Sequence, residues 1–254
     1  MNRTQRGRAL IIACCLLAGV GTLTGGPTSV RATAGGQLSL SLCDPATQSF
    51  TSTVTNTYSP FPAGAIWHYS DGAGNTTDVS VQRGVVFRFS GHRAVDTVDV
   101  VESDKNADGT REVSDNWYAQ TTTGAAGTVC YFGEQEHDFD ATGHLILPDP
   151  APGSWLSTQP GFAPGIVMPA NPQVGQKFDQ EFAPGTAEDE GEIVGIDSTD
   201  TVNGKTYSNV VRMLEGDDLA SGQGHDDTKL FAPGVGPIRD EALLLTSCSG
   251  APGC

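Results

Sequence analysis

Short stretches in which apolar and polar residues alternate dominate the chain beyond residue 54. Val79, Val81, Val85, Phe87 and Phe89 all fall on odd positions, so in an extended strand their side chains share one face. No stretch beyond the first residues sustains the three- and four-residue spacing of a long amphipathic helix. This pattern predicts an all-β fold built from short strands.

Further strands are predicted on both sides of the middle of the chain. Residues 95–101 carry apolar side chains on both alternating sets of positions, which indicates a strand buried on both faces. Residues 193–196 and 207–213 have the β-branched and aromatic content of two more strands. Between them, Asn203-Gly204 favours a two-residue type I′ turn, because both residues tolerate positive φ.

The most distinctive feature of the sequence is an internal repeat. Several residues recur after 113 positions, and two residues further upstream recur after 111. The pairs are Gly91 with Gly204, Glu102 with Glu215, Gly109 with Gly222, Tyr118-Ala119 with Phe231-Ala232, Gly64 with Gly175, and Trp67 with Phe178. Two related β units of this kind are able to cover each other's apolar faces.

The repeat predicts two related antiparallel β units, residues 54–147 and 173–246, that form one curved sheet, a sandwich or a half-barrel. An N-terminal segment, 35–53, precedes the first unit. A Pro- and Gly-rich crossover, 148–172, joins the units, and its apolar content indicates that it is ordered. A cysteine-containing tail, 247–254, ends the chain.

The first 34 residues have the composition of an export signal. Arg3, Arg6 and Arg8 form a basic start, an apolar run follows at 9–20, and Ala32-Thr33-Ala34 matches the small-x-small cleavage pattern. The apolar run is 12 residues long, which is too short to span a bilayer as a helix. We therefore expect a secreted protein without a membrane span.

Acidic residues outnumber basic residues in the expected mature chain. Removal of residues 1–34 takes away four arginines and no acid, which changes the net charge from −16 to −20. A surface of this charge repels nucleic acid and anionic membranes, and it is compatible with cation binding. The charge therefore argues against a nucleic-acid partner.

Four cysteines remain after the export signal: Cys43, Cys130, Cys248 and Cys254. In an exported chain four cysteines indicate two disulfides, and the sequence leaves all three connectivities open. We expect the bonds to fasten the ends of the mature chain to its body. No paired Cys-x-x-Cys units are present, so the cysteines do not indicate a zinc site.

One loop has the ligand spacing of a calcium-binding loop. Counted from Asp104, oxygen-bearing residues occupy positions 1, 3, 5, 7, 9 and 12, and glycine occupies position 6. The flanking segments are predicted strands rather than helices, so a solvated acidic turn stays open as the alternative. Calcium is the one cofactor that the sequence suggests, and its predicted ligands are Asp104, Asn106, Asp108, Thr110, Glu112 and Asp115.

Carboxylates beside aromatic residues suggest sugar chemistry as a second possibility. Asp115 shares a predicted strand face with Trp117, and Glu134 shares one with Phe132. An acid pair next to aromatic rings would suit glycoside hydrolysis if these strands paired. The adjacent cluster of acids and histidines in 134–144 lacks metal-ligand spacing, and we interpret it as a solvated loop.

Five groups of residues carry distinctive motifs: 56–69 (NTYSPFPAGAIWHY), 115–120 (DNWYAQ) with 131–134 (YFGE), 164–170 (PGIVMPA), 180–189 (QEFAPGTAED) and 231–236 (FAPGVG). Together they resemble a family of exported bacterial β-proteins of uncharacterised function that is common in actinobacteria. The resemblance covers about residues 54–242 and implies no catalytic residue. Members usually have Trp at the position of Cys130, and they often have Tyr-Tyr at Leu230-Phe231.

These observations favour a non-catalytic binding or envelope-associated protein that takes a glycan or an apolar small ligand. Trp67, Trp117 and Trp155 are the predicted lining residues of its binding face. No catalytic residue is predicted for this reading. The alternatives are a carbohydrate-active hydrolase that uses Asp115 and Glu134, and a structural domain stabilised by calcium.

Overall fold

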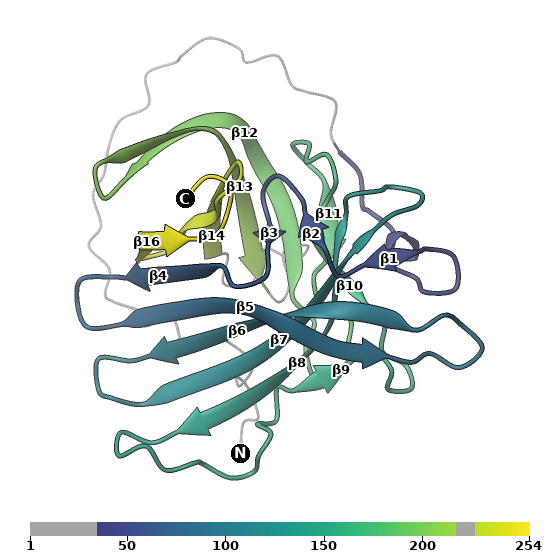
Figure 1. The fold of residues 1–254 in the computed structure, drawn as a ribbon, viewed down its shortest axis with the longest axis horizontal. Coiled ribbons are helices and arrows are strands. Elements are labelled where there is room, and N and C mark those ends of the chain that lie inside the picture. Colours follow the sequence, from purple (N-terminus) through teal and green to yellow (C-terminus); the bar gives the residue numbers. More distant parts are fainter. Residues whose placement is uncertain (1–34, 217–226) are drawn as a thin grey trace, which may run out of the picture.

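The computed structural model describes residues 35–216 and 227–254, so the predicted export signal 1–34 and the repeat position Gly222 lie outside the described residues. The described chain consists mainly of antiparallel strands, which confirms the predicted all-β class (Figure 1). Within these ranges no helix is long and apolar enough to cross a membrane.

The strands that lie before residue 173 are short at the start of the chain and long in its middle. They are β1 (Phe50–Thr51), β2 (Val54–Thr55), β3 (Pro60–Phe61), β4 (Ile66–Ser70), β5 (Thr76–Phe87), β6 (Val95–Lys105), β7 (Arg111–Thr121), β8 (Val129–Phe139), β9 (Trp155–Leu156) and β10 (Gly165–Met168). A 3₁₀ turn, η1 (Leu40–Leu42), precedes them.

The remaining strands follow in the second unit. They are β11 (Lys177–Asp179), β12 (Glu190–Val202), β13 (Lys205–Gly216), β14 (Asp227–Ala232), β15 (Gly236–Asp240) and β16 (Leu243–Ser249). The strand order of the large sheet is β10-β8-β7-β6-β5-β4-β16-β15-β14-β13-β12-β11, with β1 paired to β7 and β9 paired to β8. The hairpin β2–β3 forms a separate two-stranded sheet.

The two units contribute the same meander of consecutive antiparallel strands, β4 to β8 and β11 to β15. The repeat places β5 on β12, β6 on β13 and β7 on β14. The register of the sheet shifts between Trp117 and Tyr118 on β7 and between Leu230 and Phe231 on β14, which are positions 113 residues apart. A bulge at the same place in both units supports descent from one copied module.

A side-chain hydrogen bond also recurs, with donor and acceptor exchanged. Thr97 Oγ1 donates to the Val85 carbonyl at 2.7 Å, and Ser198 Oγ donates to the Val210 carbonyl at 2.9 Å. Val85 corresponds to Ser198 and Thr97 corresponds to Val210 at the 113-residue offset. In both hairpins a side-chain hydroxyl therefore donates a hydrogen bond to a backbone carbonyl next to a shift in the register of the paired strands.

The large sheet curves until its two edges nearly meet. β16 joins the units by pairing with β15 on one side and β4 on the other. The edge strands β10 and β11 do not pair, yet a Cβ added at Gly165 would stand 1.9 Å from the Gln180 carbonyl oxygen. The Ala163 N–H donates to the Phe182 carbonyl at 3.0 Å and links the two edges. The sheet thereby surrounds an interior (Figure 1).

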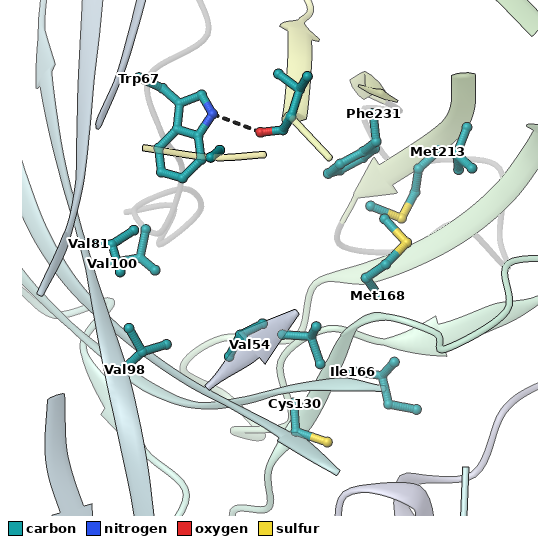
Figure 2. Close-up of a cluster of buried hydrophobic side chains, with 14 of the residues drawn as sticks. Val54, Trp67, Val81, Val98, Val100, Cys130, Ile166, Met168, Met213 and Phe231 are labelled. Atoms are coloured by element: carbon teal, nitrogen blue, oxygen red, sulfur yellow. Dashed lines mark hydrogen bonds between the residues drawn. The ribbon is translucent and has the colours of Figure 1, made fainter. Parts of the chain in front are cut away.

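Apolar side chains of both units meet in this interior. In Figure 2 they point toward one another around the hairpin β2–β3: Val81, Val98 and Val100 from the first unit, Met213 and Phe231 from the second, and Val54 from the hairpin. Trp67 Nε1 donates to the Val235 carbonyl at 2.8 Å and so bonds β4 to the second unit (Figure 2). Burial of each such large side chain stabilises the fold by about 1.5–3 kcal/mol.

One buried amide holds the hairpin β2–β3 in place. Asn56 is 5% exposed, and its Nδ2 donates to the carbonyls of Gly127 at 2.8 Å and Pro169 at 3.1 Å. Its Oδ1 accepts from the backbone N–H groups of Tyr58 at 2.8 Å and Ser59 at 3.2 Å. A single side chain therefore fixes the hairpin to two loops of the large sheet.

Substitution Asn56→Ala is expected to lower the free energy of unfolding by about 2–4 kcal/mol, because buried backbone groups on three segments lose their partners. The measurement is urea denaturation of the mature protein. Asn171→Ala, at an exposed position, is the matched control and should stay within about 0.5 kcal/mol of the wild type. Equal denaturation midpoints for the two variants would contradict the anchoring role.

Two disulfides fasten the ends of the described chain. Cys43–Cys130 bonds the N-terminal segment to β8, and Cys248–Cys254 bonds the C-terminal tail to β16. This pairing selects one of the connectivities that the sequence left open. The crossover 148–172 contributes β9 and β10, and both of these strands pair with β8.

Candidate functional site

The inner face of the first unit changes from apolar to acidic along its strands. Antiparallel pairing of β6 and β7 brings their inward positions into register, so the change occurs at the same end of both strands. From the apolar end, the inward residues are Val98, Val100, Glu102 and Asp104 on β6, and Tyr118, Asn116, Ser114 and Glu112 on β7.

A cavity of ≈ 240 Å³ lies in the interior toward this acidic end. It is larger than the apolar cavity of about 150 Å³ that accommodates benzene in a well-studied case. Residues of both units and of the hairpin β2–β3 line it. Nine of them are acids and one is a base: Glu102, Asp104, Glu112, Glu134, Glu136, Glu181, Asp189, Glu215, Asp240 and Lys229.

Burial of these carboxyl groups changes their protonation. It raises the pKa of Glu102, Glu112 and Glu181 to about 8 each, and neighbouring carboxylates add to the increase. The pKa of Glu134 is raised well above its usual value by the same two causes in the same order. Glu102, Glu112 and Glu181 therefore carry protons to a large extent at neutral pH, chiefly because burial disfavours their charged form.

Among the described residues, Lys229 on β14 is the one base that lines the cavity. Its Nζ lies 2.8 Å from Glu215 Oε2 and 3.3 Å from Asp240 Oδ2. Burial by itself lowers the pKa of Lys229, but the Asp240, Glu215 and Glu102 carboxylates outweigh burial and raise this pKa well above its usual value. Lys229 is therefore a permanently charged ammonium group that neutralises part of the second unit's side of the cavity.

A second hollow of ≈ 190 Å³ adjoins the cavity beyond Lys229. The two hollows adjoin, because they share five lining residues: Asp104, Asp189, Glu215, Lys229 and Asp240. The second hollow adds Lys105 and Asp227 at its far side.

Aromatic rings form the other wall of the cavity. Tyr118 and Tyr131 stack with their ring centroids 4.6 Å apart, and Phe61 of the hairpin lies 5.1 Å from Tyr118. Tyr69 donates its hydroxyl hydrogen to the Pro237 carbonyl at 3.0 Å, and Trp67 lies beside it on β4. The site thus combines flat apolar surfaces with carboxyl groups.

Ser59 adds an unsatisfied polar group to the cavity wall. This residue is 1% exposed, and its Oγ has no hydrogen-bond partner within the described residues. A buried hydroxyl without a partner costs on the order of 1–3 kcal/mol, and Ser59 Oγ is able to hydrogen-bond to a molecule in the cavity.

The structure separates the three tryptophans that the sequence suggested as lining residues. Trp67 lines the cavity. Trp155 is 1% exposed and lies behind the wall, with its ring 5.2 Å from that of Tyr131 and its Nε1 3.1 Å from Glu181 Oε1. Trp117 packs against Phe87 and does not line the cavity.

The predicted calcium loop is a turn between β6 and β7 whose oxygen atoms do not converge. Asp108 accepts from Thr110, Asn106 donates to Thr110 Oγ1, and Asp104 accepts from Thr77 Oγ1. Glu112 faces the cavity, whereas Asp115 does not line it. No three acidic, histidine or cysteine side chains in the described ranges are placed to hold a metal ion. Calcium binding stays a prediction and would require this loop to rearrange.

The structure places Asp115 and Glu134 on opposite faces of the sheet. Glu134 is directly opposite Asn116, and both line the cavity, so Asp115 on the next position points the other way. The predicted shared face of Glu134 and Phe132 is also wrong. A bulge places Glu134 on the cavity side, while Phe132 packs against Phe87 with ring centroids 5.6 Å apart.

On its own face Asp115 belongs to a different cluster. His137 Nε2 lies 3.8 Å from Asp115 Oδ2, and His137 Nδ1 lies 2.5 Å from Asp149 Oδ1. Burial and the Asp115 carboxylate raise the pKa of Asp99 to about 7. The acidic segment 134–144 is therefore divided, with Glu134 and Glu136 inside the cavity and His137 outside it.

Sequence reasoning missed most of the residues that make this cavity, Glu181 and Lys229 among them. One signal was present, since Glu102 and Glu215 correspond in the repeat and both line the cavity. Comparison of the chain with known protein families, with curated proteins and with solved structures gives no match. The geometry of the cavity is therefore the evidence that bears on function.

Proposed function

We propose that this chain is a secreted, non-catalytic binding protein that holds a small ligand in the cavity inside its curved sheet. The cavity carries the proposal, because it brings aromatic rings together with converging polar side chains, nine acids and one lysine among them, around one space that is able to hold a small molecule. The unpartnered Ser59 hydroxyl and the disulfides at both ends of the described chain support it.

A hydrolase is the less favoured reading. The carboxyl pair suggested for it, Asp115 and Glu134, lies on opposite faces, and hydrolysis of a glycosidic bond requires two acids that flank the bond. Calcium stabilisation is less favoured as well, because the loop ligands point in different directions. A binding role needs no such convergence and uses the cavity as it stands.

A larger side chain that fills the cavity is expected to weaken binding of the ligand. Val79 on β5 lines the cavity, so Val79→Trp places an indole in the ligand's space and should weaken binding at least tenfold. Native mass spectrometry of the secreted protein would detect a co-purified molecule. A thermal-shift panel of amines, sugars and apolar compounds would supply further candidates.

Two further variants make the cavity test decisive. Gln82→Trp adds the same ring at an exposed position of β5 and should leave every affinity unchanged. Ser114→Met intrudes less from β7 and tests the same point with a smaller risk to folding. Candidates that bind Val79→Trp and Ser114→Met as tightly as the wild type would refute a binding site in the cavity.

A further inference from the structure

We propose that the ligand of this cavity is an aliphatic organic cation with at least two ammonium groups, a diamine or polyamine. The inference rests on the proposed binding function and adds the chemical class of the ligand. It follows from the arrangement of charge, rings and an unpartnered hydroxyl around the cavity.

The balance of charge in the cavity is the first argument. Nine acids and one lysine line the cavity, and Lys229 already pairs with Glu215 and Asp240. Among the described residues, no base lies within ion-pair distance of Glu102, Glu112 or Glu134. Bound ammonium groups would supply the missing positive charge and relieve the repulsion among carboxylates, whereas an anion would increase it.

The chain itself shows that the site suits an ammonium group. Lys229 Nζ is an alkylammonium held between carboxylates on adjacent strands, 2.8 Å from Glu215 and 3.3 Å from Asp240. The carboxylates on β6, β7 and β8 offer comparable positions along the opposite wall. A ligand with two or more ammonium groups would repeat the Lys229 arrangement there.

The walls also suit the methylene segments between ammonium groups. The rings of Tyr118, Tyr131, Phe61 and Trp67 line the cavity and present apolar surface to an alkyl chain. Ser59 Oγ is 1% exposed, lacks a protein partner and is able to accept an N–H hydrogen. This hydroxyl is an observation independent of the acids.

Other ligand classes fit less well. The described residues bring no three metal-ligating side chains together, so the acids do not form a metal site. A neutral sugar or an apolar molecule would displace water from the carboxyl groups and give them no positive partner, so they would stay protonated or repel one another. A multiply charged amine displaces this water and also supplies positive charge to the carboxyl groups.

The test is isothermal titration calorimetry of the mature protein with spermidine, with 1,4-butanediol as a neutral analogue and cellobiose as a glycan. Titrations at about 0.15 M salt suppress binding to the acidic surface. We expect spermidine to bind and the diol not to bind. Spermidine binding to Val79→Trp, which keeps the surface charge, should be at least tenfold weaker.

Proton release provides a second readout. Glu102 faces Asp104, Glu112, Lys229 and Asp240, and an ammonium placed among these groups favours ionised carboxylates. We expect spermidine binding to release protons into the buffer, and its affinity to rise as pH increases from 6 to 8, by up to tenfold per pH unit for each proton released.

Two single substitutions locate the interaction. Glu102→Gln removes one charge from the cavity and should weaken spermidine binding about tenfold to hundredfold. Asp96→Asn removes one charge from an exposed position of the same strand and should change the affinity less than twofold. Thermal unfolding confirms that both variants fold.

The outcomes separate the ligand class from the binding function. Spermidine that binds wild type and Val79→Trp equally, or that binds without proton release, overturns the proposed cation class. Cellobiose or an apolar compound that binds in the cavity while spermidine does not also overturns this class, but it leaves the binding function intact. Failure of every compound to distinguish the wild type from Val79→Trp refutes the binding function itself.

Discussion

The free energy of unfolding is expected to fall as the pH rises from 5 to 8, by at least about 4 kcal/mol in total. Burial raises the pKa of Glu102, Glu112 and Glu181 to about 8 in the folded protein, against 4.5 for an unperturbed glutamate. The folded state therefore binds more protons than the unfolded state over this interval. Stability is complete below about pH 4.5 and is lost as the pH rises through the folded-state pKa.

The magnitude follows from proton linkage. One proton taken up on folding corresponds to about 1.4 kcal/mol for each pH unit, so one proton over three units gives the expected loss. The three glutamates share the cavity and titrate together, so the loss exceeds that of one group and is less than three independent groups would give. Exposed Asp140, whose pKa is lowered to about 2 chiefly by the Thr142 hydroxyl, acts in the opposite direction, but only below pH 4.

The measurement is chemical denaturation of the mature protein at half-unit pH steps. Glu102→Gln combined with Glu112→Gln should flatten the dependence, because glutamine resembles the protonated acid and does not titrate. Asp96→Asn should leave the slope unchanged. A protein whose stability increases steadily from pH 5 to 8 would show that these carboxyl groups are ionised in the folded state.

Local sequence patterns predicted much of the fold. The β-branched and aromatic content of 193–196 and 207–213 corresponds to β12 and β13, and Asn203 and Gly204 have φ of 48° and 80° in the turn between them. The repeat predicted two like units, and their shared bulges agree with it. The strands and the turn depend on contacts within a few residues, so they can be predicted from the sequence alone.

The faces of the strands were harder to predict. The inward side of β8 changes at the bulge, so Tyr131 and Glu134 share the cavity although their numbers differ in parity. Regular alternation without a bulge would place Glu134 on the same face as Phe132, which is what the sequence predicted. Trp117 was predicted to line the binding face for a similar reason. An aromatic residue prefers burial, but this preference does not specify on which face of the sheet it is buried.

The cavity itself depends on contacts between distant segments. Lys229 and Glu102 are on different units, and Glu181 follows the edge strand β11. Pairing of the two units through β16, together with the curvature of the sheet, brings them together, and no local pattern encodes this arrangement. The equal spacing of Glu102 and Glu215 in the repeat was the one indication, and a pair of acids at equivalent strand positions is equally typical of an exposed surface.

Removal of the positive charge at Lys229 is expected to destabilise the protein by about 3 kcal/mol at pH 8. Lys229→Met keeps the aliphatic stem but leaves Glu215 and Asp240 without their ammonium partner. The Glu215 side chain is only 14% exposed, so water compensates its charge poorly. Breaking one side of a buried ion pair typically costs about 3–5 kcal/mol, and the partial exposure of Lys229 places this case at the lower limit.

The loss should depend on pH, which distinguishes electrostatics from packing. Without the ammonium, the pKa of the Asp240 carboxyl group rises further, and its protonation at pH 5 relieves part of the uncompensated charge. The difference in unfolding free energy between Lys229→Met and the wild type should therefore be smaller at pH 5 than at pH 8. Denaturation of both proteins at the two pH values measures it.

Lys177→Met is the matched control for this substitution. Lys177 lies 3.1 Å from Glu192, but its side chain is 42% exposed, so its loss should cost less than about 1 kcal/mol at either pH. Addition of Glu215→Gln to Lys229→Met should recover part of the stability at pH 8, because it removes one uncompensated carboxylate. If Lys229→Met costs no more than Lys177→Met at pH 8, the ammonium group does not hold the acidic wall together, and the Lys229 arrangement loses its value as a precedent for a bound amine.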